Sequence, residues 1–266
     1  MILTLMLAAA QPAAAYDPAA GKSPIRDLVA SESGQYCLPG RELCLELSGD
    51  PDSGEIPANL IVSFPASGDA EKTSLPLPAF SGEVQGLSLW PHLVSVRTDK
   101  SGRHEGLEFL VGVIGEERAM YSGGGGSGGR LHLMRFGMGP HGMGLGDPVL
   151  DVVWDSSLMI RACFSEQDMK DRLEACHDDY SFKANLTASP DDKGAFPSLT
   201  YSSIATAYPR TSRRSEDNSA GKLKKSDLTH WRDPECSYTR LLHYNDATAR
   251  YEMDRAAPDC SDYTTP

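Results

Sequence analysis

The stretch Arg130-Leu131-His132-Leu133-Met134-Arg135-Phe136 decides how this chain is expected to fold. Its side chains alternate with a period of two residues, which is the period of a β-strand and not of a helix. His132, Met134 and Phe136 fall on the same face of such a strand. The stretch therefore predicts a strand with two distinct faces.

Similar strand-sized runs, rich in β-branched, aromatic or alternating apolar residues, occur on both sides of this stretch. They cover residues 43–47, 59–64, 87–90, 93–98, 107–114, 149–154, 158–164, 180–187 and 199–207. Turn residues separate them at the spacing that is typical of sandwiches and barrels. We therefore predict a mainly β protein, an antiparallel β-sandwich or barrel-like domain in which two layers pack face to face.

One segment is expected to be helical. Ser165-Glu166-Gln167-Asp168 has the pattern of a capping box, which marks the start of a helix. This pattern predicts one short helix near 166–176.

Three segments interrupt the strand pattern and are expected to be loops. Residues 121–129 are mostly glycine, and residues 137–148 combine Gly, Met, His and Pro without periodicity. Residues 210–226 are polar, with six basic side chains against two acidic ones. This third loop is predicted to be solvated, with the binding of an anion as the alternative.

The first fifteen residues are an apolar run that ends in small residues, with Ala13 and Ala15 forming an A-x-A cleavage site. The apolar part is much shorter than the roughly 20 residues that cross a bilayer. The segment therefore predicts a signal peptide that is cleaved near Ala15, although no Lys or Arg precedes the apolar run. We expect a periplasmic or secreted protein.

The mature chain is expected to begin with a flexible arm over residues 16–32, which are rich in Ala, Pro and Ser. A single disulfide-bonded β domain over residues 33–266 follows, with a weak boundary near residue 148 as the alternative. Beyond residue 15 the longest apolar runs, such as 107–114, are strand-sized, so no membrane span is expected in the mature chain.

Six cysteines, an even number, predict up to three disulfides in an exported chain. Cys37 and Cys44 flank a short turn, so they would lie opposite each other on the strands of a hairpin. A second hairpin around the turn at 245–249 brings Cys236 beside Cys260 when its register is extended. These two pairs are therefore predicted to be bonded.

The remaining cysteines, Cys163 and Cys176, lie at the two ends of the predicted helix. An unbroken helix over 166–176 would be about 16 Å long, whereas a disulfide needs Cα atoms within roughly 7 Å of each other. The two residues can bond only if the helix is shorter or the chain doubles back along it. Two alternatives stay open, this pair or pairing over a longer range.

The chain of 266 residues carries a formal net charge of −12. That sign argues against binding to nucleic acid, whose phosphates need a basic surface. It favours either a soluble surface or a cationic partner.

Ser127 lies in Gly125-Gly126-Ser127-Gly128-Gly129, which matches the G-x-S-x-G pattern. Asp151 and His177 follow in the chain order of an α/β-hydrolase. A nucleophile of that class sits on a turn from a strand into a helix, whereas here a predicted strand follows. Ser127, Asp151 and His177 are therefore catalytic candidates and not a predicted triad.

Two further groups of side chains could serve acid–base chemistry. His177 adjoins Asp178 and Asp179, either of which could orient it as a general base, with helix capping as the alternative. Asp151 and Asp155 would share one face of a strand, like the carboxylate pair of a glycosidase, with solvated strand edges as the alternative.

One group of residues could bind a metal. Thioether and imidazole groups suit copper, and five of them lie close together in the sequence, namely His132, Met134, Met138, His141 and Met143. Core packing of Met134 beside an ordinary glycine loop is the alternative. No cofactor is predicted.

These observations favour an exported, non-enzymatic binding or inhibitor-like protein whose partner is a cationic protein, for example a cell-wall-lytic enzyme. A hydrolase that uses Ser127 or a His/Asp site is the first alternative. A periplasmic copper-binding protein is the second.

Overall fold

The computed structural model describes residues 23–32, 34–48, 56, 58–65, 69–80, 84–96, 108–139, 142–188 and 195–266. The predicted signal peptide lies outside the described residues. Among the helices of the described residues, none is both long enough and apolar enough to cross a membrane.

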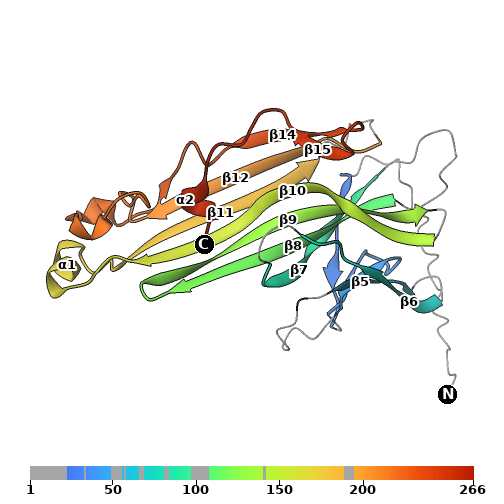
Figure 1. The fold of residues 1–266 in the computed structure, drawn as a ribbon, viewed down its shortest axis with the longest axis horizontal. Coiled ribbons are helices and arrows are strands. Elements are labelled where there is room, and N and C mark those ends of the chain that lie inside the picture. Colours follow the sequence, from blue (N-terminus) through green and yellow to red (C-terminus); the bar gives the residue numbers. More distant parts are fainter. Residues whose placement is uncertain are drawn as a thin grey trace, which may run out of the picture.

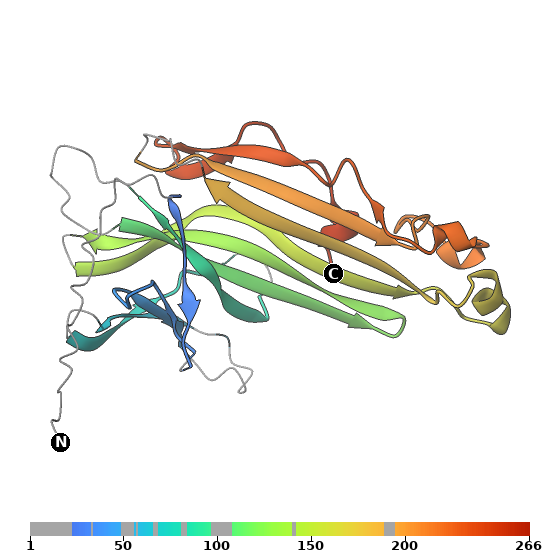
Figure 2. The same ribbon diagram turned by 180° about the vertical axis from the view of Figure 1, so that it is seen from behind.

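Most of the described chain belongs to one antiparallel sheet of ten strands (Figures 1 and 2). Strands β7 to β12 follow one another as neighbours, so this part of the sheet is a meander. The strands run in the order β1 (Ile25–Asp27), β7 (Gly86–Ser95), β8 (Glu108–Tyr121), β9 (Gly124–Gly139), β10 (Gly142–Arg161), β11 (His177–Ala188), β12 (Leu199–Tyr208), β14 (Thr239–Asn245) and β15 (Arg250–Met253), with β13 (Trp231–Arg232) also paired to β12. The stretch 130–136 lies in β9, near the middle of this sheet.

A second, five-stranded sheet packs on one face of the large one. Its strands are β2 (Val29–Ala30), β3 (Tyr36–Cys37), β4 (Cys44–Leu47), β5 (Asn59–Phe64) and β6 (Asp69–Pro76). Leu45 and Leu60 of the small sheet share a core with Val111, Met134 and Phe136 of the large one. The two layers arise because alternate side chains of β8 and β9 are apolar on this face. The predicted fold class, mainly antiparallel β with a short helix, is confirmed.

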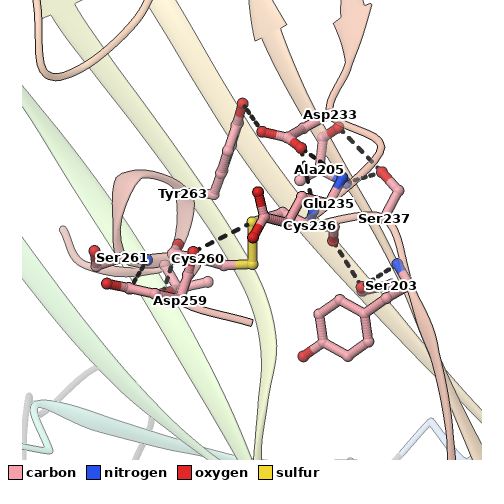
Figure 3. The surroundings of a disulfide bond; sticks show 12 residues. Ser203, Ala205, Asp233, Glu235, Cys236, Ser237, Asp259, Cys260, Ser261 and Tyr263 are labelled. Carbon is pink, nitrogen blue, oxygen red and sulfur yellow. Dashed lines mark hydrogen bonds between the residues drawn. A yellow bond between two sulfur atoms is a disulfide. The ribbon is translucent and has the colours of Figure 1, made fainter. Parts of the chain in front are cut away.

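A second core lies between β10, β11, β12 and the C-terminal segment. Tyr180 and Tyr201 are buried there together with Tyr263 of the short helix α2 (Ser261–Thr264). Tyr263 is held at both ends: its hydroxyl donates to Asp233 Oδ2 at 3.0 Å, and its carbonyl accepts from Ser156 Oγ at 2.6 Å. Figure 3 shows how α2, the Asp233 turn and a disulfide meet.

Three disulfides join the six cysteines, and the bonded pairs are Cys37–Cys44, Cys163–Cys176 and Cys236–Cys260. Their Cα atoms are 4.0, 4.8 and 5.7 Å apart. Cys163 is therefore bonded to Cys176, and the alternative of pairing over a longer range is wrong.

The predicted helix is shorter than expected. Ser165 forms the expected capping box, but α1 covers only Glu166–Asp171. Leu173 and Glu174 have φ values of 52° and 69°, in the left-handed region that ends helices. The chain doubles back there, and this reversal brings Cys176 to Cys163.

The first glycine-rich segment is a strand and not a loop. A tight turn at Ser122 and Gly123 joins β8 to β9, and Gly124 to Gly129 pair with both neighbouring strands. A sheet ladder uses only backbone groups, which glycine supplies as well as any residue. Gly126 also allows a close approach, because an added Cβ would lie 3.3 Å from the Cα of Pro266.

The second glycine-rich segment, 137–148, is also mostly strand. β9 continues to Gly139, and β10 begins at Gly142. The boundary considered near residue 148 falls inside β10, where the pairing with β9 shifts register on both sides of Pro148. Irregular pairing of this kind is a β-bulge.

The predicted N-terminal arm is not loosely held over its described part. β1 pairs with β7 of the large sheet, and β2 pairs with β3 of the small one. Leu28 lies between them and is only 6% exposed. Its burial in the core between the sheets fixes this segment.

Candidate functional site

The structure does not bring Ser127, Asp151 and His177 together. Ser127 pairs with Ser157 of β10, whereas His177 pairs with Arg161, four residues further along that strand. Asp151 lies six residues from Ser157 in the other direction, about 20 Å away at 3.3 Å per residue. A catalytic triad needs hydrogen-bond contact between its members, so these residues do not form one.

The neighbours of His177 also differ from the prediction. Asp178 points to the opposite side of β11, where it is 2% exposed and accepts hydrogen bonds from Arg172 Nη2 at 2.6 Å and Ser212 Oγ at 2.5 Å. His177 and Asp179 are exposed on the other side. Asp178 therefore serves a buried ion pair and does not orient His177.

Asp151 contacts a different histidine, His132, which lies directly opposite it on β9. Asp151 Oδ2 is 3.5 Å from His132 Nδ1, and Asp151 Oδ1 accepts from Arg130 Nε at 2.8 Å. The His132 ring is 1% exposed and packs against Phe80 with 4.5 Å between the ring centroids. Burial lowers the pKa of His132, while the nearby Asp151 charge partly opposes this effect and the Arg130 charge adds to it.

This lowered pKa predicts a loss of stability on mild acidification. Below pH about 6.5 the unfolded chain binds a proton at His132 that the folded chain does not, so the free energy of unfolding falls as the pH falls. We expect His132→Gln to reduce the slope of stability against pH by up to about 1.4 kcal/mol per pH unit between pH 6.5 and the lowered pKa. Urea unfolding measured from pH 7.5 to 5 checks this. The matched control is His243→Gln, which replaces an exposed histidine. Equal slopes of stability against pH in the two variants would contradict a lowered pKa at His132.

The structure describes the side chains of three of the five residues considered for copper, namely His132, Met134 and Met143. His132 and Met134 are 1% and 0% exposed and lie in the core. Met143 packs against the core between the two sheets. His141 and the side chain of Met138 lie outside the described residues. Among the described residues, no three His, Cys, Asp or Glu side chains are placed to hold a metal ion.

The structure instead presents Ser127 at the centre of an exposed sheet surface, which we call the open face. Three neighbouring rows of side chains define it, each running across β8 to β12. The first row consists of Glu116, Gly129, Asp155, Lys183 and Ile204. The middle row consists of Arg118, Ser127, Ser157, Ser181 and Thr206, and Arg232 of β13 continues it. The third row consists of Met120, Gly125, Met159, Asp179 and Tyr208. Apart from Gly129, every residue of these rows is exposed or half-buried.

The opposite side of the same strands is covered. Leu158, Tyr180 and Phe182 alternate with residues of the open face and are at most 2% exposed. α2 packs against β10 and β11 on that side. Among the described residues, the open face is thus the exposed side of a sheet whose other side forms the core.

The middle row is a series of hydroxyl groups. Ser127, Ser157, Ser181 and Thr206 lie on adjacent strands, which are about 4.8 Å apart, and an arginine stands at each end. Ser181 Oγ and Thr206 Oγ1 are 2.8 Å apart and hydrogen bonded. Such groups donate and accept hydrogen bonds. Ser127 pairs with Arg118 on one side and Ser157 on the other, and the carboxylates Glu116 and Asp155 lie in the neighbouring row.

The row beside it carries two carboxylates, Glu116 and Asp155, on either side of Gly129. A side chain at Gly129 would collide with Asp155 Oδ1, so the glycine leaves room for that carboxylate. Burial raises the pKa of Asp155, and the Glu116 charge raises it further, while Lys183 opposes both. Arg118 Nη2 lies 2.9 Å from Glu116 Oε2, so Glu116 is already part of an ion pair on this surface.

The expectation that Asp151 and Asp155 share one face of a strand is wrong. Asp151 faces His132 and Asp155 faces Gly129, and these two partners lie on opposite faces of β9. The cause is a register shift between Val153 and Asp155, which inserts one extra residue into β10.

Sequence reasoning missed the open face and the buried Arg172. The alternation of small polar with apolar residues in β10, β11 and β12 is a signal for the open face, but only the strand order aligns the hydroxyl groups into a row.

No family model, no curated protein and no solved structure matches this chain.

Proposed function

We propose that this is an exported, non-enzymatic binding protein that uses its open face to hold a cationic protein. The observation that carries the proposal is the open face itself, a five-strand surface with exposed side chains opposite a filled core. Apart from Gly129, the side chains that define this surface are exposed or half-buried, so they are accessible to a protein partner.

Export is supported by the cysteines. All six are bonded in pairs. Disulfides persist in oxidising compartments and are rare in the cytosol. The apolar first fifteen residues agree with this location.

The charge of the partner is inferred from the net charge of −12 of the whole chain. The open face itself carries three acidic side chains and three basic ones, namely Glu116, Asp155 and Asp179 against Arg118, Lys183 and Arg232. A Lys or Arg side chain of a partner would pair with Asp155 above Gly129 and would share Glu116 with Arg118, whose Nη2 lies 2.9 Å from Glu116 Oε2. Neighbouring groups of the partner would bond to the hydroxyl row. The acidic field of the whole chain would speed the approach of a basic protein, for example a cell-wall-lytic enzyme.

We expect the protein to retain a basic partner from envelope extract at low salt and to release it as salt screens the charges. Glu116→Gln with Asp155→Asn should weaken the binding at least tenfold, because roughly 1.5 kcal/mol or more is lost when a close interfacial charge pair is removed. Binding is measured by pull-down followed by titration with the recovered partner.

The matched control is Glu235→Gln with Asp246→Asn, which removes the same charge from exposed sites elsewhere. The pH dependence of binding is a second measurement. Because the pKa of Asp155 is raised, Asp155 loses its charge at a higher pH than an ordinary aspartate does. As the pH is lowered, the affinity should therefore begin to fall at a correspondingly higher pH. Glu116→Gln alone should move that fall to lower pH. Recovery of no basic partner at low salt, or equal weakening by both double variants, would overturn the proposal.

A further inference from the structure

Two methionines stand on either side of a glycine at one end of the open face. Met120 of β8 pairs with Gly125 of β9, and Gly125 pairs with Met159 of β10, so the three residues lie side by side on neighbouring strands (Figure 1). Met120 is 88% exposed and Met159 is 45% exposed. Among the described residues, no other large apolar side chain is as exposed as Met120. Both residues are therefore accessible to small molecules in the solvent.

The glycine keeps the space between the two methionines free of a third side chain. The Met120 side chain uses this space, because its Sδ lies 2.8 Å from the position that a Cβ of Gly125 would occupy. On the other side of Met159 stands Asp179, which is exposed as well. The exposure of the Met120 thioether thus arises within regular β structure, where its cross-strand neighbour is a glycine.

The other sulfur atoms of the described chain are buried, half-buried or already oxidised. All six cysteines form disulfides, so no thiol competes for an oxidant. Met134 is 0% exposed, and Met143 and Met253 pack against the two cores. Among the described methionines outside the open face, Met169 of α1 is the most exposed, at 46%. Because oxidation of sulfur side chains follows their exposure, Met120 is expected to react first.

We propose that Met120 and Met159 form a methionine oxidation site that reacts with peroxides outside the cytosol. A lone pair of the thioether Sδ attacks one oxygen of hydrogen peroxide while the O–O bond breaks. The sulfur gains that oxygen and is oxidised by two electrons, and the remainder of the peroxide is reduced to water. The product, methionine sulfoxide, is polar, whereas the thioether is apolar. Oxidation therefore makes the apolar end of the open face polar.

The consequence for binding rests on the proposed function of the open face. Met120 and Met159 lie in the row next to the hydroxyl groups, where a bound protein would cover them. A sulfoxide that is covered loses its hydrogen bonds to water, which costs free energy unless the partner supplies a donor. Oxidation should therefore weaken the binding of a cationic partner.

The site is tested on the purified protein alone. The protein is treated with hydrogen peroxide, and sulfoxide formation at each methionine is followed over time by mass spectrometry of its peptides. Met120 should be oxidised first, at least about tenfold faster than the buried Met134, and Met159 should also react ahead of Met134. Equal rates at Met120 and Met134, or oxidation of Met169 before Met120, would overturn the proposal.

The effect on binding is measured with the basic partner recovered by pull-down, before and after peroxide treatment. Oxidation should weaken the binding at least about fivefold, and treatment with methionine sulfoxide reductase should restore it. Met120→Leu with Met159→Leu replaces both thioethers by side chains of similar volume that peroxide does not oxidise. The affinity of this variant should therefore be the same before and after treatment.

The matched control is Met169→Leu, which removes an exposed thioether outside the open face and should leave the sensitivity to peroxide in place. Unchanged binding by the oxidised wild type, or equal loss in the Met120 and Met159 double variant, would overturn the control of binding by oxidation. Recovery of no basic partner by the untreated protein would instead contradict the proposed function, while the mapped sulfoxides still decide the oxidation site.

Discussion

Replacing Arg172 with alanine is expected to lower the free energy of unfolding by about 3–5 kcal/mol, the cost of leaving a buried charge without its partner. The side chains of Arg172 and Asp178 are 1% and 3% exposed, and Arg172 Nη2 lies 2.6 Å from Asp178 Oδ1. Arg172 also donates from Nε to Ala175 O at 2.9 Å and from Nη1 to Asn218 O. The substitution therefore frees three elements at once: the end of α1, the start of β11 and the basic loop.

The matched control is Lys222→Ala, which removes the exposed ion pair with Asp171 at the same end of the molecule. Exposed pairs contribute at most about 1 kcal/mol, so this variant should unfold close to the wild-type urea midpoint. Combining Arg172→Ala with Asp178→Ala should recover part of the loss, because the unpaired carboxylate is removed as well. Equal midpoints for Arg172→Ala and Lys222→Ala would contradict the assignment of a buried ion pair.

The strands and the hairpin disulfides were predictable because their causes are local. Alternation in 130–136 needs only the period of the strand, and the spacing of Cys37 and Cys44 needs only a short turn. The capping box at Ser165 is local as well. Each of these signals lies within a few neighbouring residues.

The errors share a different cause, which is the contribution of distant strands. Gly124 to Gly129 carry no strand signal of their own, and they are ordered because β8 and β10 pair with them on both sides. The helix is short because Leu173 and Glu174 have positive φ values, in the left-handed region. Neither residue type favours that backbone conformation by itself. The bulge before Asp155, which moves it to the open face, is likewise visible only in the register.

The candidate site could be predicted only residue by residue. Ser127, Asp151 and Asp155 were each singled out from the sequence, but their neighbours depend on register across four strands. A shift of one residue moves a side chain to the opposite face of the sheet. The open face therefore required the strand order, whereas the basic character of the loop 210–226 could be read from composition alone.

Removing the Cys236–Cys260 disulfide by the double substitution Cys236→Ser and Cys260→Ser is expected to lower the free energy of unfolding by about 3.5 kcal/mol, the loop-closure value for its sequence separation of 24. The bond fixes the C-terminal segment over the second core, where Cys236 is 4% and Cys260 8% exposed. Urea unfolding of the variant, compared with the wild type, measures the loss.

The matched control is the double substitution of Cys37 and Cys44 by serine, whose separation of 7 gives about 2.4 kcal/mol by the same relation. The two variants should also differ in where they open. Asp233 Oδ1 accepts from Cys236 N at 3.1 Å while its Oδ2 accepts from the Tyr263 hydroxyl, so α2 keeps one link to the turn after the disulfide is lost (Figure 3). Hydrogen exchange should therefore rise first at the N–H groups of Tyr263, Thr264 and Thr265, which bond within this segment. A larger loss of stability from the Cys37 and Cys44 variant would show that the small sheet, and not the C-terminal segment, depends more on its disulfide.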